Sequence, residues 1–350
     1  MLKQRKNTKI VRIGNVNIGC GAPVAVQSMC NINADRPDEL AAQATALKEA
    51  GCNILRVAVP DKDSVFIIDK IKSAVDIPLV ADIHFDYRIA LECAAAGIDK
   101  IRINPGNIGD ESRVGQVAKT CRDKGIPIRI GVNSGSVEKN ILAKYGGPTA
   151  DALVESAEYH SGMLHKFDFD NIVLSVKSSE VSVMIEAYTK LSEKFDYPLH
   201  LGVTEAGTPR SGIAKSAMGI GYLLLNGIGD TIRVSLTSDP IEEIPAAYDI
   251  LQFAGYDIEK PEIISCPTCG RTQIDLIKLT WEIERRALKL KRKIKIAVMG
   301  CAVNGPGEAK EADFGICGGA DCALIIKKGE IIKKVPFENA ADELFMIIEN

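Results

Sequence analysis

Short apolar runs alternate along the chain with longer stretches whose apolar residues recur at helical spacing. The unit repeats eight times between residues 24 and 255, as an apolar strand, a polar loop and a helix-patterned stretch. This alternation is typical of strand–helix units that build a parallel sheet. The predicted strands are residues 24–29, 54–60, 78–85, 100–106, 127–135, 171–179, 198–207 and 231–237. Eight such units predict an α/β fold, a closed (β/α)8 TIM barrel rather than an open sheet.

The pattern changes at both ends of this repeat. Residues 11–19 alternate polar and apolar positions around turn residues, which predicts a short hairpin before the barrel. After a last helix near 241–255, lysine, glutamate and cysteine become more frequent. We therefore predict two domains, a substrate-binding TIM barrel over 1–258 and a small α+β domain over 259–350. In the second domain the expected elements are a helix at 278–291, a strand at 295–300, a hairpin at 321–335 around Gly329 and a helix at 339–350.

Composition narrows the class of function. The 350 residues have a net charge of −3, so there is no global basic field of the kind that binds nucleic acid. No apolar stretch is long enough to span a membrane, and the first residues, MLKQRKNTKI, lack the apolar core of a signal peptide. A cytoplasmic location is expected. In that compartment the ten cysteines are expected to serve metal binding or catalysis rather than disulfides.

Four predicted barrel strands carry an arginine between two branched apolar residues, where a buried parallel strand should be apolar throughout. If the apolar neighbours face the helices, the arginines face the barrel interior, since side chains alternate between the two faces of a strand. The inward cations are then Arg56, Arg102, Arg129, Lys177 and Arg233. The same parity places Asp82, His84, Asn104, Asn133, Ser175, Thr204 and Ser235 inside, mostly toward the C-terminal ends of the strands.

The inward cations exceed the acids that could neutralise them, which are Asp82 and Glu205. Repulsion among cations in a partly dry pocket is costly unless anions compensate it. Because arginine forks match phosphate oxygens bidentately, the pattern predicts a diphosphate or bisphosphate ligand. The alternative is a network of arginine–carboxylate pairs that only fills the barrel.

Smaller polar features of the strand ends also have two interpretations each. His84 beside Asp82 is either an orienting or acid–base group or a hydrogen-bonded core histidine. Glu205 either lies at the rim of the site or is a surface carboxylate. The turns at 104–107 and 133–136, the latter with Ser134 and Ser136, could cradle an anion with backbone N–H groups.

The cysteines of the second domain allow three interpretations. Cys266 and Cys269 form a C-x-x-C loop, and Cys301 follows 32 residues later. The loop could be a thioredoxin-like dithiol, a structural zinc site completed by Cys317 or Cys322, or part of a [4Fe–4S] site. The spacing alone leaves all three open.

The motifs around these residues narrow the choice. Two motifs contain the cysteines, SCPTCGRTQIDL at 265–276 and VMGCAVNGPGEA at 298–309. The predicted barrel strands carry seven more, RVAVP, ADIHF, IRINPGN, IRIGVNSGS, VKSS, GVTEAG and IRVSLT. Together these motifs extend over nearly the whole chain. In these motifs the sequence resembles the 4-hydroxy-3-methylbut-2-enyl diphosphate synthases of the non-mevalonate isoprenoid route, in their two-domain bacterial form.

The resemblance implies a specific reaction and cofactor. The substrate would be 2-C-methyl-D-erythritol 2,4-cyclodiphosphate, opened and dehydrated by two electrons to hydroxymethylbutenyl diphosphate. A [4Fe–4S] cluster would be held by Cys266, Cys269, Cys301 and Glu308. The carboxylate binds iron less tightly than a thiolate and can give way to substrate, which makes Glu308 catalytic as well.

The resemblance also implies roles for the barrel residues and the partners. Arg56, Arg102, Arg129, Lys177 and Arg233 would clamp the diphosphate, and Glu205 would be the acid–base residue. Polar substrate contacts would come from Asp82, His84, Asn104, Asn133, Ser134, Ser136 and Ser235. Reduced flavodoxin or ferredoxin would deliver electrons. The family forms homodimers in which the cluster domain of one chain covers the barrel of the other, and its barrel is similar to that of dihydropteroate synthases.

Two other functions remain possible at this stage. One is a pterin-type transferase barrel with a structural zinc domain, and the other is an iron–sulfur sensor on an inactive barrel. The sequence departs from the expected family pattern at Cys30, where threonine is expected, and Cys317 and Cys322 are also unusual. Small buried thiols are the simplest interpretation of these three cysteines.

Overall fold

The structure is a computed structural model that describes residues 3–104, 107, 110–319 and 322–349. The chain divides into two compact units, the first ending at Tyr256 and the second beginning at Asp257.

The first unit contains eight parallel strands, in the spatial order β8-β7-β6-β5-β4-β3-β10-β9. They are β3 (Ala25–Met29), β4 (Ile54–Ala58), β5 (Leu79–Asp82), β6 (Lys100–Ile103), β7 (Ile128–Asn133), β8 (Ile172–Lys177), β9 (His200–Leu201) and β10 (Thr231–Ile232). A parallel bridge between Leu174 and Leu199 joins β8 to β9 and closes the ring. The predicted TIM barrel is therefore confirmed. β9 and β10 pair over two residues each and are much shorter than the predicted strands at 198–207 and 231–237. After β9 the chain turns at Glu205, whose φ is 51°.

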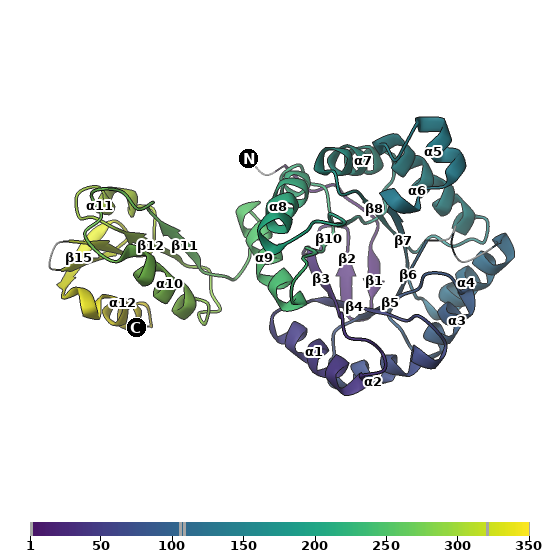
Figure 1. Cartoon of the computed structure of the whole chain (residues 1–350), viewed down its shortest axis with the longest axis horizontal. Helices are drawn as coiled ribbons and strands as arrows, with labels where there is room; N and C mark the ends of the chain where they lie inside the picture. The colour runs from purple at the N-terminus through teal and green to yellow at the C-terminus, as the bar shows by residue number, and fades with distance from the viewer. Residues whose placement is uncertain (1–2, 105–106, 108–109, 320–321, 350) are drawn as a thin grey trace. The chain divides into compact units, whose positions relative to one another are not determined.

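Helices surround the strands as an outer ring (Figure 1). They are α1 (Pro37–Glu49), α2 (Ile67–Ala74), α3 (Tyr87–Ala95), α4 (Glu111–Lys124), α5 (Lys139–Tyr145), α6 (Ala150–His165), α7 (Val181–Lys194), α8 (Pro209–Leu225) and α9 (Glu243–Phe253). Side-chain caps begin several of them, since Asp86, Asp110 and Thr149 accept hydrogen bonds from backbone N–H groups of the first turn. No helix in the described part of the chain has the length and apolarity needed to cross a membrane.

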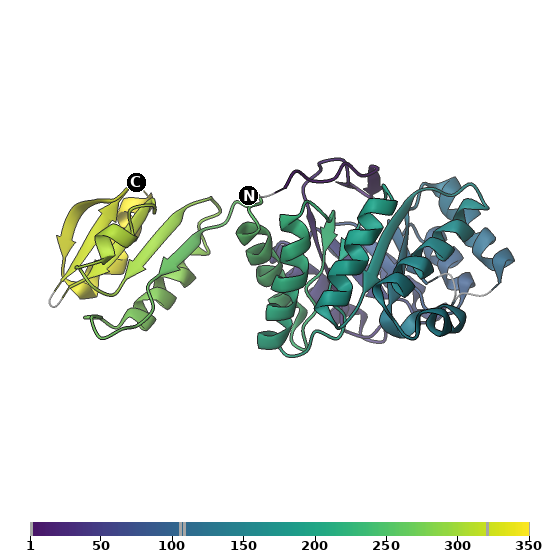
Figure 2. The same ribbon diagram turned by 90° about the horizontal axis from the view of Figure 1, so that it is seen from above.

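The predicted hairpin before the barrel is present as β1 (Val11–Ile13) and β2 (Val16–Ile18), which pair antiparallel. Its buried side chains Val11, Ile13 and Ile18 pack against residues near the starts of the barrel strands, including Ala25 and Ile54. Figure 2 shows the N-terminal segment lying across one end of the barrel. The hairpin thus closes the N-terminal end, and the polar strand ends lie toward the other.

The second unit is built on one five-stranded sheet in the order β11-β12-β13-β14-β15. The strands are β11 (Glu262–Ser265), β12 (Lys295–Met299), β13 (Phe314–Gly318), β14 (Ala323–Lys327) and β15 (Glu330–Val335). The first three are parallel and the last three antiparallel. The hairpin around Gly329 was predicted, whereas β11 and β13 were not.

Two helices pack on one face of this sheet and a short helix on the other. Alternate residues of β12 show this, because Ile296 and Val298 join a core with α10 (Leu276–Ala287) and α12 (Ala340–Glu349). Ala297 and Met299 instead join Ala309, which follows α11 (Gly305–Glu308). The predicted helix at 278–291 begins two residues earlier and ends at Ala287, since Asp275 caps its first turn.

Candidate active site

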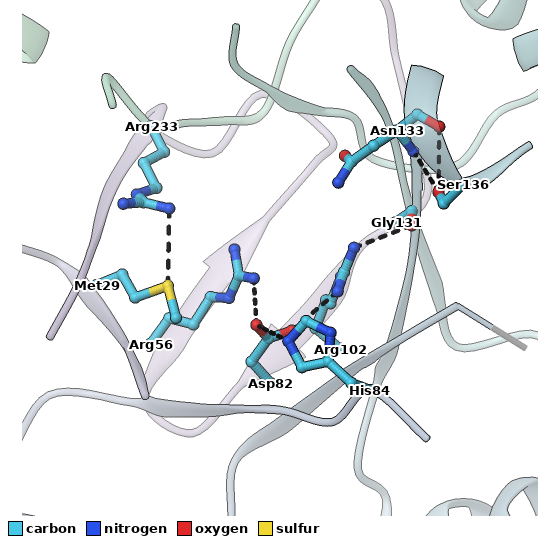
Figure 3. A network of polar contacts seen from close by, with 9 residues as sticks. All are labelled: Met29, Arg56, Asp82, His84, Arg102, Gly131, Asn133, Ser136 and Arg233. Atoms are coloured by element: carbon cyan, nitrogen blue, oxygen red, sulfur yellow. Dashed lines mark hydrogen bonds and ion pairs between the residues drawn. The ribbon is translucent and has the colours of Figure 1, made fainter. Parts of the chain in front are cut away.

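An aspartate between two arginines anchors the polar interior of the barrel (Figure 3). Asp82, at the end of β5, accepts a hydrogen bond from Arg102 Nη1 at 3.1 Å on Oδ1 and one from Arg56 on Oδ2. Burial alone would raise the pKa of the Asp82 carboxyl, but the Arg56 charge and the surrounding donors hold it well below its ordinary value. The carboxylate is therefore ionised and fixes both guanidinium groups.

Above this anchor lies a cavity of about 230 Å³ bordered by cations. Its lining residues include all five predicted inward cations, one carboxylate and four uncharged polar side chains. They are Arg56, Arg102, Arg129, Gly131, Asn133, Ser175, Lys177, Val203, Thr204, Glu205, Arg233 and Ser235. The prediction that these side chains point into the barrel is therefore confirmed for Arg56, Arg102 and Arg129, and for Ser175 and Lys177 of β8.

Two inward glycines make room for the longest of these side chains. A Cβ atom on Gly131 would lie 2.5 Å from Arg102 Nε, and one on Gly202 would lie 2.5 Å from Lys177 Nζ. Arg102 Nη2 also donates to the Gly131 carbonyl at 3.1 Å. The space that a side chain would fill at these interior positions is thus occupied by cationic groups from neighbouring strands.

The cations are poorly neutralised by protein groups. Burial, followed by the charges of neighbouring guanidinium groups, of which Arg129 is the strongest, lowers the pKa of Lys177 well below its ordinary value. Arg129 is itself fully buried, its Nε has no hydrogen-bond partner among the described residues, and burial lowers its pKa in the same way. A ligand with several negative charges would offset both the burial of these cations and their mutual repulsion.

A further buried cation, Lys100, escaped the sequence analysis. It is fully buried, its Nζ has no hydrogen-bond partner, and burial, then Arg129 and Arg56, lowers its pKa well below the ordinary value. Lys100 precedes Arg102 by two residues on β6, so strand parity could have placed it in the interior.

The sequence analysis also missed the acid that faces Arg233. Glu243, at the start of α9, is buried, and its Oε2 lies 3.5 Å from Arg233 Nε and accepts from Ser28 at 3.1 Å. Its Oε1 accepts from the Leu236 backbone N–H at 3.1 Å. Glu243 thus fixes Arg233 beside Met29, where Nη1 approaches Sδ at 3.7 Å. No local pattern marks this glutamate, because it approaches the barrel only through the packing of α9.

The remaining predicted polar residues lie around the cavity. His84 Nε2 is 3.1 Å from Asp82 Oδ2 and the side chain is half exposed, so His84 is not the buried core histidine of the alternative interpretation. Asn133 N donates to Ser136 Oγ at 3.0 Å in the turn Ser134–Ser136, and Asn104 Nδ2 donates to the Ser136 carbonyl at 3.4 Å. His84, Asn104, Ser134 and Ser136 are not among the residues that line the cavity. Residues 105–106 of the predicted turn at 104–107 lie outside the described part of the chain.

Glu205 lies on the cavity rim and is exposed. Its φ of 51° is in the left-handed region, which a side chain with a Cβ rarely adopts. Strain of this kind costs roughly 1–3 kcal/mol and is concentrated at functional sites. Glu205 thus holds an unfavourable backbone conformation at the edge of the cationic cavity.

In the second unit, three of the predicted ligands lie in loops at the C-terminal ends of parallel strands. Cys266 follows β11, and its Sγ accepts from the Gly300 N–H at 3.2 Å, just before Cys301. The Cys269 loop is attached to the same place, since Gln273 N donates to the Gly300 carbonyl at 2.9 Å. A backbone hydrogen bond from Arg271 lowers the pKa of the exposed Cys269 thiol, which favours the thiolate that metals bind.

Cys317 and Glu308 lie in the same neighbourhood. Burial raises the pKa of Cys317 to about 12, and the proximity of Cys301, Cys266 and Glu308 adds to this shift. Gly305 at the start of α11 allows the close approach, because a Cβ there would lie 2.6 Å from Cys317 Sγ. Within the described residues, no three His, Cys, Asp or Glu side chains are placed to hold a single metal ion. Thiols from separate loops are nevertheless the donors that hold an iron–sulfur cluster.

Comparison with solved structures identifies the barrel. A dihydropteroate synthase from Xanthomonas albilineans with 4-aminobenzoic acid matches with a TM-score of 0.51 and 14% identity, covering 70% of this chain and 96% of that chain. The dihydropteroate synthase of Yersinia pestis matches with a TM-score of 0.50, 13% identity and the same coverage. At this level of identity the likeness concerns the fold alone.

Comparison with known sequences identifies the family. A protein of Clostridium perfringens, named 4-hydroxy-3-methylbut-2-en-1-yl diphosphate synthase (flavodoxin), is 57% identical over 345 residues and 99% of each chain. A protein of the same name from Fusobacterium nucleatum is 54% identical over 343 residues, 98% of this chain and 97% of that one. The GcpE TIM-barrel domain matches residues 8–248, and the GcpE protein C-terminal domain matches residues 262–350. The chain therefore belongs to the GcpE family.

Proposed function

We propose that the chain is an iron–sulfur oxidoreductase that converts 2-C-methyl-D-erythritol 2,4-cyclodiphosphate to (E)-4-hydroxy-3-methylbut-2-enyl diphosphate in isoprenoid biosynthesis. The observation that carries this proposal is a small cavity lined by five cations with few acids to neutralise them. Its relatives of the same length carry the name of this synthase. Two electrons open the ring and one water is lost.

The barrel unit binds the diphosphate. Arg102 and Arg56 are held in place by Asp82, and Arg233 by Glu243, so their forks are oriented before the ligand arrives. Among the described residues, Lys177 and Arg129 form no ion pair with an acid, so they gain the most from phosphate oxygens. Asn133 and Ser235 line the same cavity and contact the substrate hydroxyl groups and phosphates.

Two groups at the mouth handle protons. Glu205 is at the rim, where it can protonate the departing hydroxyl so that it leaves as water. His84 is half exposed, and Asp82 orients its ring through the contact at Nε2. Asn104, Ser134 and Ser136 position the adjoining turn and complete the set of polar contacts.

The second unit holds a [4Fe–4S] cluster through Cys266, Cys269, Cys301 and Glu308. The strand-end loops bring together Cys266 and the residue before Cys301, and Glu308 lies within electrostatic range of Cys317 beside them. When bound, the cluster supplies the two electrons and a Lewis-acidic iron. Cys317 is a buried neutral thiol and packs beneath the ligands. Residues 1–258 thus bind the substrate, and residues 259–350 hold the cluster.

The partners follow from the reaction. A reduced flavodoxin or ferredoxin delivers the electrons, and the relatives are named as flavodoxin-dependent synthases. The chain works as a homodimer in the cytoplasm, with the cluster domain of one chain over the barrel of the other. This arrangement brings the cluster to the substrate and excludes water from the cavity.

The test is anaerobic turnover of the cluster-loaded protein with the cyclic diphosphate and a strong reductant, followed by phosphorus NMR. The cyclic diphosphate signals are expected to give way to those of a linear diphosphate. Metal analysis of the same sample is expected to find iron and sulfide. A protein that holds zinc and needs no reductant, or a loaded cluster without turnover, would contradict the proposal.

A further inference from the structure

Helix α10 carries an apolar stripe on the side that faces away from its own domain core. Ile277, Trp281 and Leu288 are 58%, 72% and 57% exposed. The opposite side of the helix, with Leu276, Leu279, Ile283 and Ala287, already supplies the apolar face that packs on the sheet. A surface helix ordinarily needs only one apolar face, so the exposed stripe has no role in the fold of this domain. A shallow groove of about 490 Å³ runs beside Trp281.

Basic residues border this stripe. Residues 278–293 contain seven basic and two acidic residues, although the chain as a whole has a net charge of −3. Lys278, Arg285 and Lys289 are exposed next to the apolar side chains. One of the two acids, Glu282, is paired with Arg286 at 3.6 Å. The other, Glu284, is exposed and lines the groove together with Lys278 and Arg285, so the excess of positive charge comes from the rest of the segment. The surface is therefore an aromatic centre with a basic rim, which complements an acidic partner.

The same helix begins at the loops that carry the proposed cluster ligands. Leu276, in its first turn, lies under Gly300, where a Cβ atom would be 3.3 Å from Leu276 Cδ2. Gly300 donates to Cys266 Sγ and directly precedes Cys301. At 1.5 Å per residue, Trp281 lies about 7.5 Å further along the helix axis. Along the helix axis, Trp281 is thus less than two helical turns from the end that carries these thiols.

We propose that the outer face of α10, centred on Trp281, is the docking surface for an acidic flavoprotein electron donor. The proposal rests on the proposed function, which requires electrons to reach the second unit from a protein donor. Tryptophan in a solvated rim of charges is the kind of residue that carries most of the binding energy of an interface. The basic rim steers an acidic donor and makes its association sensitive to salt.

The first experiment is a binding titration that does not depend on turnover. Trp281 is the single tryptophan of the chain, so energy transfer from its indole to a bound flavin reports docking directly. Oxidised flavodoxin is titrated into the holoenzyme at low and high salt, and Trp281→Phe supplies the background of the donor's own emission. We expect quenching of the Trp281 signal that weakens as salt rises. Trp281→Ala and the double variant Arg285→Glu/Lys289→Glu, measured by calorimetry, are expected to raise Kd about ten-fold or more.

The second experiment separates docking from chemistry. Turnover is measured with reduced flavodoxin and with reduced methyl viologen, which needs no protein interface. The docking variants are expected to raise the KM for flavodoxin while kcat with the viologen stays unchanged. Ile331→Ala and Lys334→Glu, on the exposed strand β15 at the other edge of the sheet, are matched controls that should alter neither.

Three outcomes would overturn the docking proposal. They are unchanged affinity for flavodoxin in both variants, an equal loss of viologen-driven turnover, and a change in oligomeric state on size-exclusion chromatography without a change in donor affinity. The last would assign the face to a second copy of this chain. If the wild-type protein gave no turnover even with the viologen, the proposed function would fail, and the fluorescence titration would still decide whether α10 docks the donor.

Discussion

Replacing Lys177 by methionine tests whether the barrel cavity is built for an anion. The two side chains are unbranched and similar in size, so the change removes a charge with little change in packing. Lys177 is 8% exposed, and after burial the strongest effects on the pKa of its amine come from arginines, Arg129 first. We therefore expect the ligand-free Lys177→Met protein to be more stable than the wild type.

The size of the effect follows from the cost of burying an uncompensated polar group, about 1–3 kcal/mol. The melting temperature should rise by about 2–4 °C for each kcal/mol. The pH dependence has a defined sign, because the pKa of Lys177 is lowered in the folded state. Below the unfolded value of about 10.4, the unfolded chain binds more protons, so wild-type stability rises with pH toward that value. The variant should lose this component of the pH dependence.

Ligand binding should change in the opposite direction. A hydrogen bond between a charged donor and a phosphate contributes about 1.5–3 kcal/mol, so Kd for the cyclic diphosphate should rise about 10- to 150-fold. Calorimetric melting with and without ligand, together with titration calorimetry, measures both effects. Lys190→Met is the control, because Lys190 is a partly exposed lysine of α7 outside the cavity, paired with Asp151 and Glu186 at 2.7 Å. It should leave ligand affinity unchanged.

The reasoning is refuted by a lower melting temperature of ligand-free Lys177→Met. That result would mean that the lysine stabilises the barrel as part of a protein charge network. Unchanged affinity for the cyclic diphosphate would independently remove Lys177 from the proposed clamp.

Three further predictions concern the other parts of the site. Asp82→Asn should lower the free energy of unfolding by about 3–5 kcal/mol at pH 7, since it leaves buried cations without their acid. Because the pKa of Asp82 is lowered in the folded state, the wild type loses this stability as the pH falls below about 4, and the difference in unfolding free energy between the two proteins should shrink in denaturation curves. Glu205→Gln should reduce kcat about 10²- to 10⁴-fold with an unchanged melting temperature, and full activity would exclude Glu205 as the proton donor. Cys301→Ser should lose iron and visible absorbance after reconstitution whereas Cys322→Ser should keep both, and equal iron content in the two variants would contradict the ligand assignment.

Strand parity is the part of the site that local sequence could predict. Because side chains alternate along a strand, the apolar neighbours of Arg56, Arg102 and Arg129 were sufficient to place these arginines inside the barrel. The same rule places Lys100 in the interior, since it precedes Arg102 by two residues on β6 and is fully buried. The cysteine motifs were likewise visible as short strings.

Parity was less informative where the strands are short. β9 and β10 pair over two residues each, so Arg233 lies beyond the last paired residue of its strand. Its orientation depends on Glu243 of α9. A hydrophobic pattern cannot reveal such a pair, because the two residues belong to elements that meet only when the barrel is packed.

Residue type and spacing within one element are enough to predict the eight-fold strand–helix repeat, the excess of inward cations and the cysteine motifs. How those cations are shared depends on packing between elements. The folded chain places Asp82 between two arginines, forms no ion pair from Lys177 or Arg129 to an acid of the described residues, and uses Gly131 and Gly202 to admit side chains from neighbouring strands. These relations join residues far apart in the chain, and their energies depend on burial and distance, which exist only once the barrel has closed.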